Sequence, residues 1–457
     1  YGALSANTTA SYNTAVGKSS LGSTTTGQYN TAVGKSAGAS ITTGTRNTAV
    51  GGLALDAATT ADDNTAIGYH ALTSATTGAE NVAIGRASLS ELTTGASNVA
   101  VGYATLDAAT TASNNTAVGH NALTANTTGA GNTAVGQGAG VAITTGSNNT
   151  IVGKLAGDAI TTGSANVAIG EDALSAATTV SNNTAVGQGA LEVNTSGEDG
   201  VAIGTAALSK NTTGNNNIAI GYQALYDNTT GAYNTAIGWK SLFENTTASM
   251  NVAVGYDAMR DNTTGASNVA IGVEALANNT TGTPNTAVGY AALDANTTGG
   301  SNTAIGANAL GANTTASHNI ALGSDAGNSI TTGFANTLLG TGAGNSVIDG
   351  NYIISIGYNT DSSSSGADNQ IIMGDSVAGN ANNSFCFGTG STDSAIAFGA
   401  TSITAPSDIR LKEDIQDEKV GLDFINELRP VTFQWKKAKD VPAEMKAHSD
   451  SEERVMN

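Results

Sequence analysis

The sequence predicts an all-β chain: a repetitive parallel β-solenoid with 17-residue coils, followed by a small α+β domain. Glycine occupies every multiple of 17 from Gly17 to Gly374, which makes 22 units without an insertion or deletion. In most units the glycine closes the pattern Asn-(Thr/Val)-Ala-(Val/Ile)-Gly, and a period of 17 suits one solenoid coil but not a two-helix repeat. The period ends at Gly374, and the last 51 residues hold 21 of the 53 charged residues. We therefore expect a solenoid shaft over 1–374, an irregular β segment over 375–406 and a separate domain over 407–457.

The three residues before each repeat glycine predict a short strand. A β-branched residue, an alanine and an aliphatic residue follow one another, as in Val82, Ala83 and Ile84. Successive side chains of a strand point to opposite faces, so the aliphatic columns share one face and the alanines take the other. The alanine position stays small in nearly every coil, and we interpret it as a face that a neighbouring chain approaches closely. The alternative is that alanine fits a flat face of a monomeric solenoid.

A second column of aliphatic residues predicts a packed core. Most units have Leu or Met four residues after the repeat glycine, as in Leu55 and Met259. Five units have glycine there and carry Ile or Val three residues later. These pairs are Gly38 with Ile41, Gly140 with Ile143, Gly157 with Ile160, Gly327 with Ile330, and Gly344 with Val347. Such volume compensation is needed only in a close-packed interior, which excludes a disordered glycine-rich chain. The Asn before each strand predicts a ladder of stacked turn residues.

Composition excludes several function classes. The formal charge is −19 and the isoelectric point near 4.3, so nucleic-acid binding is not expected. No apolar run reaches the ~18 residues of a membrane-spanning helix, and we expect no membrane insertion. The single Cys386 excludes an intrachain disulfide framework. The four histidines are far apart in the sequence, so neither a metal site nor a cofactor is predicted.

The C-terminal segment has elements of its own. Residues 420–428 place Leu422, Ile425 and Leu428 on one side of a short helix, which Pro430 closes. Residues 431–435 then alternate as a strand with one apolar face. The run Ser-Asp-Ile-Arg-Leu-Lys-Glu-Asp-Ile from Ser407, with the later Leu-Arg-Pro-Val-Thr-Phe-Gln-Trp, closely resembles the intramolecular chaperone domain of phage tail fibres and tailspikes (peptidase S74 type).

This resemblance implies a trimeric domain that assembles an upstream β-structured fibre and cuts itself off. It maps the reactive serine onto Ser407 and the lysine onto Lys412. The pair is chemically sensible, because a serine hydroxyl needs a base and a desolvated neutral lysine can serve. The alternative is a solvated segment in which Ser407 caps a helix or turn. No activity on an external substrate is expected.

The shaft repeat carries a second resemblance. Asn-Val-Ala-Ile-Gly at Asn81–Gly85 is similar to the repeat of trimeric autotransporter adhesin heads, which are left-handed parallel β-rolls. The similarity covers about four-fifths of the chain, although the repeats of those heads are shorter than 17 residues. It implies a homotrimeric shaft.

Aromatic residues recur directly after the repeat glycine. The candidate glycan or receptor contacts are Tyr69, Tyr103, Tyr222, Trp239, Tyr256 and Tyr290. Aromatic faces along a rod suit stacking on sugar rings. The alternative is that these residues cover neighbouring coils at the corners or line a subunit seam.

Together these features predict the shaft of a bacteriophage or prophage tail fibre, extracellular and part of the virion. Its expected partners are two further copies of the chain, a host cell-surface receptor or glycan, and other tail proteins that bind through sequence missing at the N-terminus. The chain starts inside a repeat and its terminal domain is short for the resembled family, so we expect a fragment. The rivals are a bacterial trimeric surface adhesin and, less favoured, an ice-binding solenoid with threonine columns.

Overall fold

The computed structural model of the chain describes residues 1–390 and 393–400. The chain divides into two units, Tyr1–Ala405 and Pro406–Asn457. The domain expected over 407–457, with its helix and strand, lies outside the described residues. The described fold is therefore that of the first unit.

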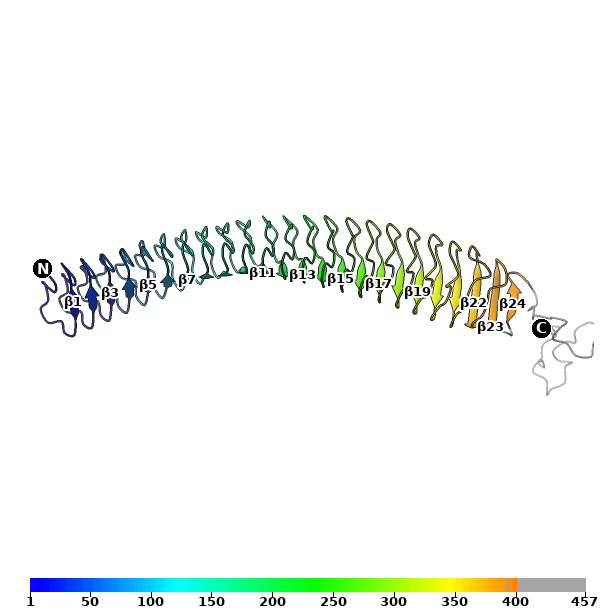
Figure 1. Cartoon of the computed structure of the whole chain (residues 1–457), viewed down its shortest axis with the longest axis horizontal. Coiled ribbons are helices and arrows are strands. Elements are labelled where there is room, and N and C mark those ends of the chain that lie inside the picture. Colours follow the sequence, from blue (N-terminus) through cyan, green and yellow to red (C-terminus); the bar gives the residue numbers. More distant parts are fainter. Residues whose placement is uncertain (391–392, 401–457) are drawn as a thin grey trace, which may run out of the picture. The chain divides into compact units, whose positions relative to one another are not determined.

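The described residues form a parallel β-solenoid in which each coil contributes one strand to a single sheet (Figure 1). The first 21 strands have three residues each and end directly before a repeat glycine. Their bounds are β1 Thr14–Val16, β2 Thr31–Val33, β3 Thr48–Val50, β4 Thr65–Ile67, β5 Val82–Ile84, β6 Val99–Val101, β7 Thr116–Val118, β8 Thr133–Val135, β9 Thr150–Val152, β10 Val167–Ile169, β11 Thr184–Val186, β12 Val201–Ile203, β13 Ile218–Ile220, β14 Thr235–Ile237, β15 Val252–Val254, β16 Val269–Ile271, β17 Thr286–Val288, β18 Thr303–Ile305, β19 Ile320–Leu322, β20 Thr337–Leu339 and β21 Ile354–Ile356. The predicted fold class is confirmed.

Three longer strands end the sheet. They are β22 Gln370–Asp375, β23 Ser384–Thr389 and β24 Ser394–Ala397. From β1 to β22 each strand pairs in parallel with the residues 17 positions later, for example Ala185 with Ala202. The step from β22 to β23 is 14 residues, and β24 pairs antiparallel with β23. The sheet therefore changes its repeat and its direction at the C-terminal end of the described shaft.

Hydrogen bonds join neighbouring coils around most of the coil, not only at the strand. In one coil, the Leu55 amide donates to Ala71 (3.0 Å), Ala57 to Thr73 (3.0 Å) and Thr59 to Thr76 (3.1 Å). At the corner before the strand, the Asp63 backbone N–H donates to the Thr45 carbonyl of the preceding coil (3.1 Å). The turns therefore hydrogen-bond to the neighbouring coil as regularly as the strand does. An inserted or deleted residue anywhere in the coil would break such bonds, which keeps the coil length at 17 residues.

The alanine column is buried inside the chain itself, which corrects the expectation that it faces a neighbouring chain. Alanines such as Ala185 and Ala202 are fully buried, whereas the flanking aliphatic residues, such as Ile203, are partly exposed. The two exceptions in this column explain why. Ile151 packs against Gly157, and Leu338 packs against Gly344, each a glycine in the position that most coils fill with Leu. In most coils alanine leaves room for the large side chain of the opposite wall, and where the strand itself carries Ile151 or Leu338, a glycine leaves the room instead.

The predicted volume compensation is confirmed at atomic detail. Ile41, Ile143, Ile160, Ile330 and Val347 are all buried. A Cβ added at Gly140 would lie 2.9 Å from Cδ1 of Ile143, so the isoleucine occupies the space above that glycine. Both arrangements use a left-handed backbone, because Leu123 has φ 52° and Gly140 has φ 58°. One aliphatic group fills one site from either of two positions.

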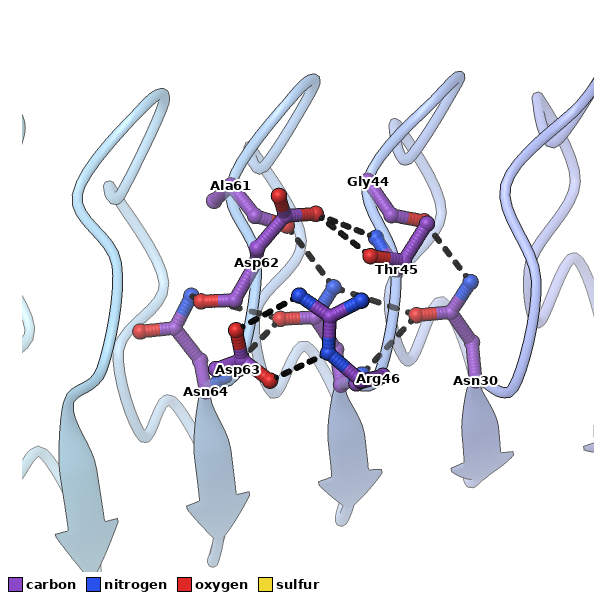
Figure 2. Close-up of polar contacts among 9 residues, drawn as sticks. Asn30, Gly44, Thr45, Arg46, Ala61, Asp62, Asp63 and Asn64 are labelled. Carbon is purple, nitrogen blue, oxygen red and sulfur yellow. Dashed lines mark hydrogen bonds and ion pairs between the residues drawn. The ribbon is translucent and has the colours of Figure 1, made fainter.

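The predicted asparagine ladder is present and buried (Figure 2). Asn47 donates its backbone N–H (3.0 Å) and its side-chain Nδ2 (3.1 Å) to Oδ1 of Asn30. The Asn30 amide in turn donates to the Gly44 carbonyl, 2.9 Å away. A second ladder, which the sequence interpretation missed, runs from Asn194 to Asn313 at intervals of 17, with Nδ2 of each donating to Oδ1 of the one before. Both ladders satisfy polar groups that the narrow core would otherwise leave unpaired.

Candidate functional surfaces

The first candidate surface is the outer face of the sheet, defined as the first and third residues of strands β1–β21. Its third-residue column consists of Val, Ile and Leu, and members such as Ile203, Ile271 and Leu339 are 39–42% exposed. No residue of these strands is charged. Monomeric proteins rarely expose a continuous apolar surface of this kind, so the outer face is a candidate binding surface.

Bulkier apolar side chains continue the outer face beyond β21. Ile371 of β22 is paired with Phe385 of β23, which is paired with Ile396 of β24. These three residues and Phe398 line an open apolar groove of about 260 Å³. Met373 and Phe398 are 41% and 49% exposed. Aromatic and long aliphatic side chains thus gather where the described shaft ends.

The second candidate surface is an aromatic patch, made of Tyr222, Tyr226, Trp239, Phe243 and Tyr256. Tyr222 and Tyr256 stack on the two sides of Trp239, with ring centroids 6.0 and 4.8 Å away. Tyr226 and Phe243 stack beside them at 5.4 Å. The sequence analysis named Tyr222, Trp239 and Tyr256. It missed Tyr226 and Phe243, which are likewise 17 residues apart.

Two lysines complete the aromatic patch. The Lys240 ammonium lies 4.6 Å from the Trp239 ring centroid and 5.0 Å from that of Phe243. The Lys210 ammonium lies 4.7 Å from the Tyr226 ring centroid and 2.6 Å from Oδ1 of Asp227. Since Trp239 has rings over both faces, it presents its edge to a partner, and the patch offers edges and cations rather than free ring faces.

The remaining aromatic candidates lie apart from this patch. Tyr69 meets the edge of His70, and Tyr103 stacks on His120 with centroids 5.2 Å apart. Tyr290 is 58% exposed and makes no ring contact within the described residues. All three occupy the same corner of different coils. A role for any of these six residues in binding stays a prediction.

Asp257 lies beside the aromatic patch in an unusual environment. Its Oδ1 is buried without a hydrogen-bond partner, and its Oδ2 lies 3.7 Å from Arg260. Burial raises the pKa of this carboxyl above its ordinary value, and the nearby Arg260 and Lys240 offset only part of that effect. Within the described residues no group of three or more His, Cys, Asp or Glu could hold a metal ion.

The threonine columns serve the stacking of coils. The Thr25 hydroxyl donates to the Thr42 carbonyl at 3.2 Å, and Thr42 donates to Thr59 at 3.1 Å. The next residue of each pair, such as Thr43, is exposed. One of the two hydroxyls of such a pair is therefore bonded within the chain, and the other faces solvent.

The proposed reactive pair, Ser407 and Lys412, lies outside the described residues, so the structure gives it no geometry. The described residues contain no helix with the length and hydropathy that a membrane crossing requires.

Exposed ion pairs link neighbouring coils. Arg46 binds Asp63 at 2.6 Å (Figure 2), and Lys154 binds Glu171 at 3.0 Å.

Comparison with known proteins identifies one part of the chain. Residues 407–451 match the Peptidase_S74 family, described as the chaperone of endosialidase. No curated protein and no solved structure matches the chain. The resemblance inferred from the C-terminal residues is thereby confirmed. A β-solenoid of 17-residue coils with such a C-terminal segment suits a phage tail fibre or tailspike.

Proposed function

We propose that this chain is the shaft of a bacteriophage or prophage tail fibre that attaches the virion to its host. The C-terminal segment acts as an intramolecular chaperone that aligns three copies of the chain. The observation that carries the proposal is the uninterrupted solenoid followed by a segment of the endosialidase chaperone family. Nearly identical coils cannot specify their own register, so an assembly of such chains needs an aligning element at one end.

Deletion of residues 407–457 tests this function. Light scattering should give a trimeric mass for the full chain and either a monomer or an aggregate for the truncated chain. Circular dichroism would show whether the truncated chain keeps its β-structure, which separates failed assembly from failed folding. A soluble trimer without residues 407–457 would contradict the chaperone role.

We further propose a single self-cleavage next to Ser407. The Ser407 hydroxyl attacks the carbonyl carbon of a neighbouring peptide bond, and Lys412 accepts its proton. The bond to nitrogen breaks, the amine leaves protonated, and water hydrolyses the resulting ester. Mass spectrometry of the wild type against Ser407→Ala tests this step. An uncut wild-type chain would contradict it.

The aromatic patch is our proposed contact with a host glycan. Ring edges, tyrosine hydroxyls and two ammonium groups can bind the hydroxyl and acidic groups of a sugar chain. Trp239→Ala should reduce binding of the fibre to host cells at least tenfold, whereas Tyr352→Ala, which changes an exposed tyrosine that is not a candidate contact, should leave binding within about twofold. Equal binding by both variants would contradict this contact.

A further inference from the structure

We propose that the outer face of the sheet, and not the alanine face, is the surface through which copies of this chain associate. The occupant is a second copy of the same chain, parallel and in register. This inference rests on the proposed assembly of several chains and names the surface that they use.

The first argument is the chemistry of the face. Along strands β1–β21, every third-position side chain is Val, Ile or Leu, and every first-position side chain is Thr, Val or Ile. Charged residues such as Arg46, Asp63 and Lys154 lie in other columns of the coil. An interface on this face would bury aliphatic side chains and threonines and no unpaired charge.

The second argument is its area. A strand of three residues spans about 10 Å, and 20 steps of about 4.8 Å from β1 to β21 give about 96 Å, so the face covers roughly 1,000 Å². A stable interface buries about 800 Å² on each partner. The outer face of one chain is thus large enough for a specific complex, although its width is only three residues.

The third argument is self-complementarity. Each copy repeats the same ridge of aliphatic side chains at the same interval, so ridges of a parallel copy can interlock along the whole length. The alanine column offers no competing surface, because Ala185, Ala202 and their equivalents are buried in the chain's own core.

The fourth argument is the gradient along the face. The bulkiest side chains, including Phe385 and Phe398, lie at its C-terminal end and line the apolar groove there. That end is nearest in sequence to the segment that matches the chaperone family. Association that starts at this end would place the largest apolar contacts first and extend along the smaller residues of the shaft.

Charge substitutions on the full-length chain test the face. The first variant carries Ile203→Asp, Ile237→Asp and Ile271→Asp, which place a carboxylate on the outer face of alternate coils. These residues are 37–42% exposed in the single chain, so its own core should tolerate the change. The matched control places Asp in the same coils at exposed threonines away from the sheet: Thr213, Thr247 and Thr281.

Light scattering should show that the outer-face variant associates at least tenfold more weakly than the wild type, while the control keeps the wild-type mass. An outer-face variant with unchanged mass would overturn this inference and leave the proposed assembly intact. A wild type that is monomeric at every concentration would overturn both.

Cross-linking adds a readout that does not depend on stability. Ile203→Cys should form a disulfide between two copies under mild oxidation, since the same residue of each chain lies in the interface. Thr213→Cys should not, and the wild type reports any background from the buried Cys386. Cross-linking of Thr213→Cys in preference to Ile203→Cys would place the interface elsewhere and refute the proposal.

Discussion

Replacement of one repeat glycine should disrupt the solenoid far more than replacement of another glycine in the same coil. Gly170 has φ +134°, a conformation that L-residues rarely adopt. A Cβ added there would lie 2.6 Å from both the carbonyl carbon and the carbonyl oxygen of Gly187 in the next coil. Gly163→Ala is the matched control, because its Cβ would also crowd a carbonyl of the next coil, that of Val180, but no positive φ is required.

The expected magnitudes differ for a stated reason. The forced backbone at Gly170 costs about 1–3 kcal/mol, and the overlap with the next coil about 1–3 kcal/mol more. At Gly163 only the overlap applies. Other coils accommodate a larger residue at the equivalent position, since Ala61, Ala112 and Val180 stand in the same column and are buried. We therefore expect about 2–6 kcal/mol for Gly170→Ala and below about 1 kcal/mol for Gly163→Ala.

Native-state hydrogen exchange read by mass spectrometry is the appropriate assay, because a solenoid opens locally. A loss of about 3 kcal/mol corresponds to a more than 100-fold faster exchange, and it should be confined to the coils on either side of residue 170. Equal losses for the two variants would refute the claim that backbone conformation, rather than crowding, fixes the 17-residue glycine column.

Three further predictions concern the core and the charges. Ile143→Ala should cost about 2–4 kcal/mol in urea unfolding because it empties the space above Gly140, and adding Gly140→Leu should recover more than half; no recovery would contradict the compensation. Asn262→Ala should cost about 1–3 kcal/mol because it removes the hydrogen bonds that join Asn262 to the side chains of Asn245 and Asn279 in the two neighbouring coils, and more than Asn126→Ala, whose neighbouring coils have no Asn at this position; a reversed order would count against the ladder. Burial raises the pKa of Asp158 above 3.8, so the folded chain favours its protonated form and loses stability as pH rises from that value towards the raised pKa. Asp158→Asn should therefore increase the free energy of unfolding at pH 7 but not below pH 3.8, as measured by urea titration at both pH values; a gain of equal size at both would exclude this cause.

Much of the candidate chemistry could be placed from the sequence, but not its grouping. The corner position of Trp239 followed from the repeat, whereas its stacking between Tyr222 and Tyr256 depends on the close rise from coil to coil. The pair Tyr226 and Phe243 carried the same signal, an interval of 17, and a search of every column for aromatic residues would have found it. Lys240 bridges two aromatic columns, which no spacing along the chain indicates.

The amino-acid sequence alone established the coil: its length of 17 residues, its three-residue strand, its glycine corner and its exchange of Leu for Gly with Ile. These features arise from local backbone rules and from the constancy of core volume, both of which repeat in every unit. Which face of the strand lies inside became clear only from the fold in three dimensions, because alternation gives two faces but assigns neither to the core. The large side chain opposite, such as Leu191, fills the narrow interior, so in most coils the strand offers it only a methyl group. The larger aliphatic side chains are thereby turned outward, where they form the surface that a second copy can cover.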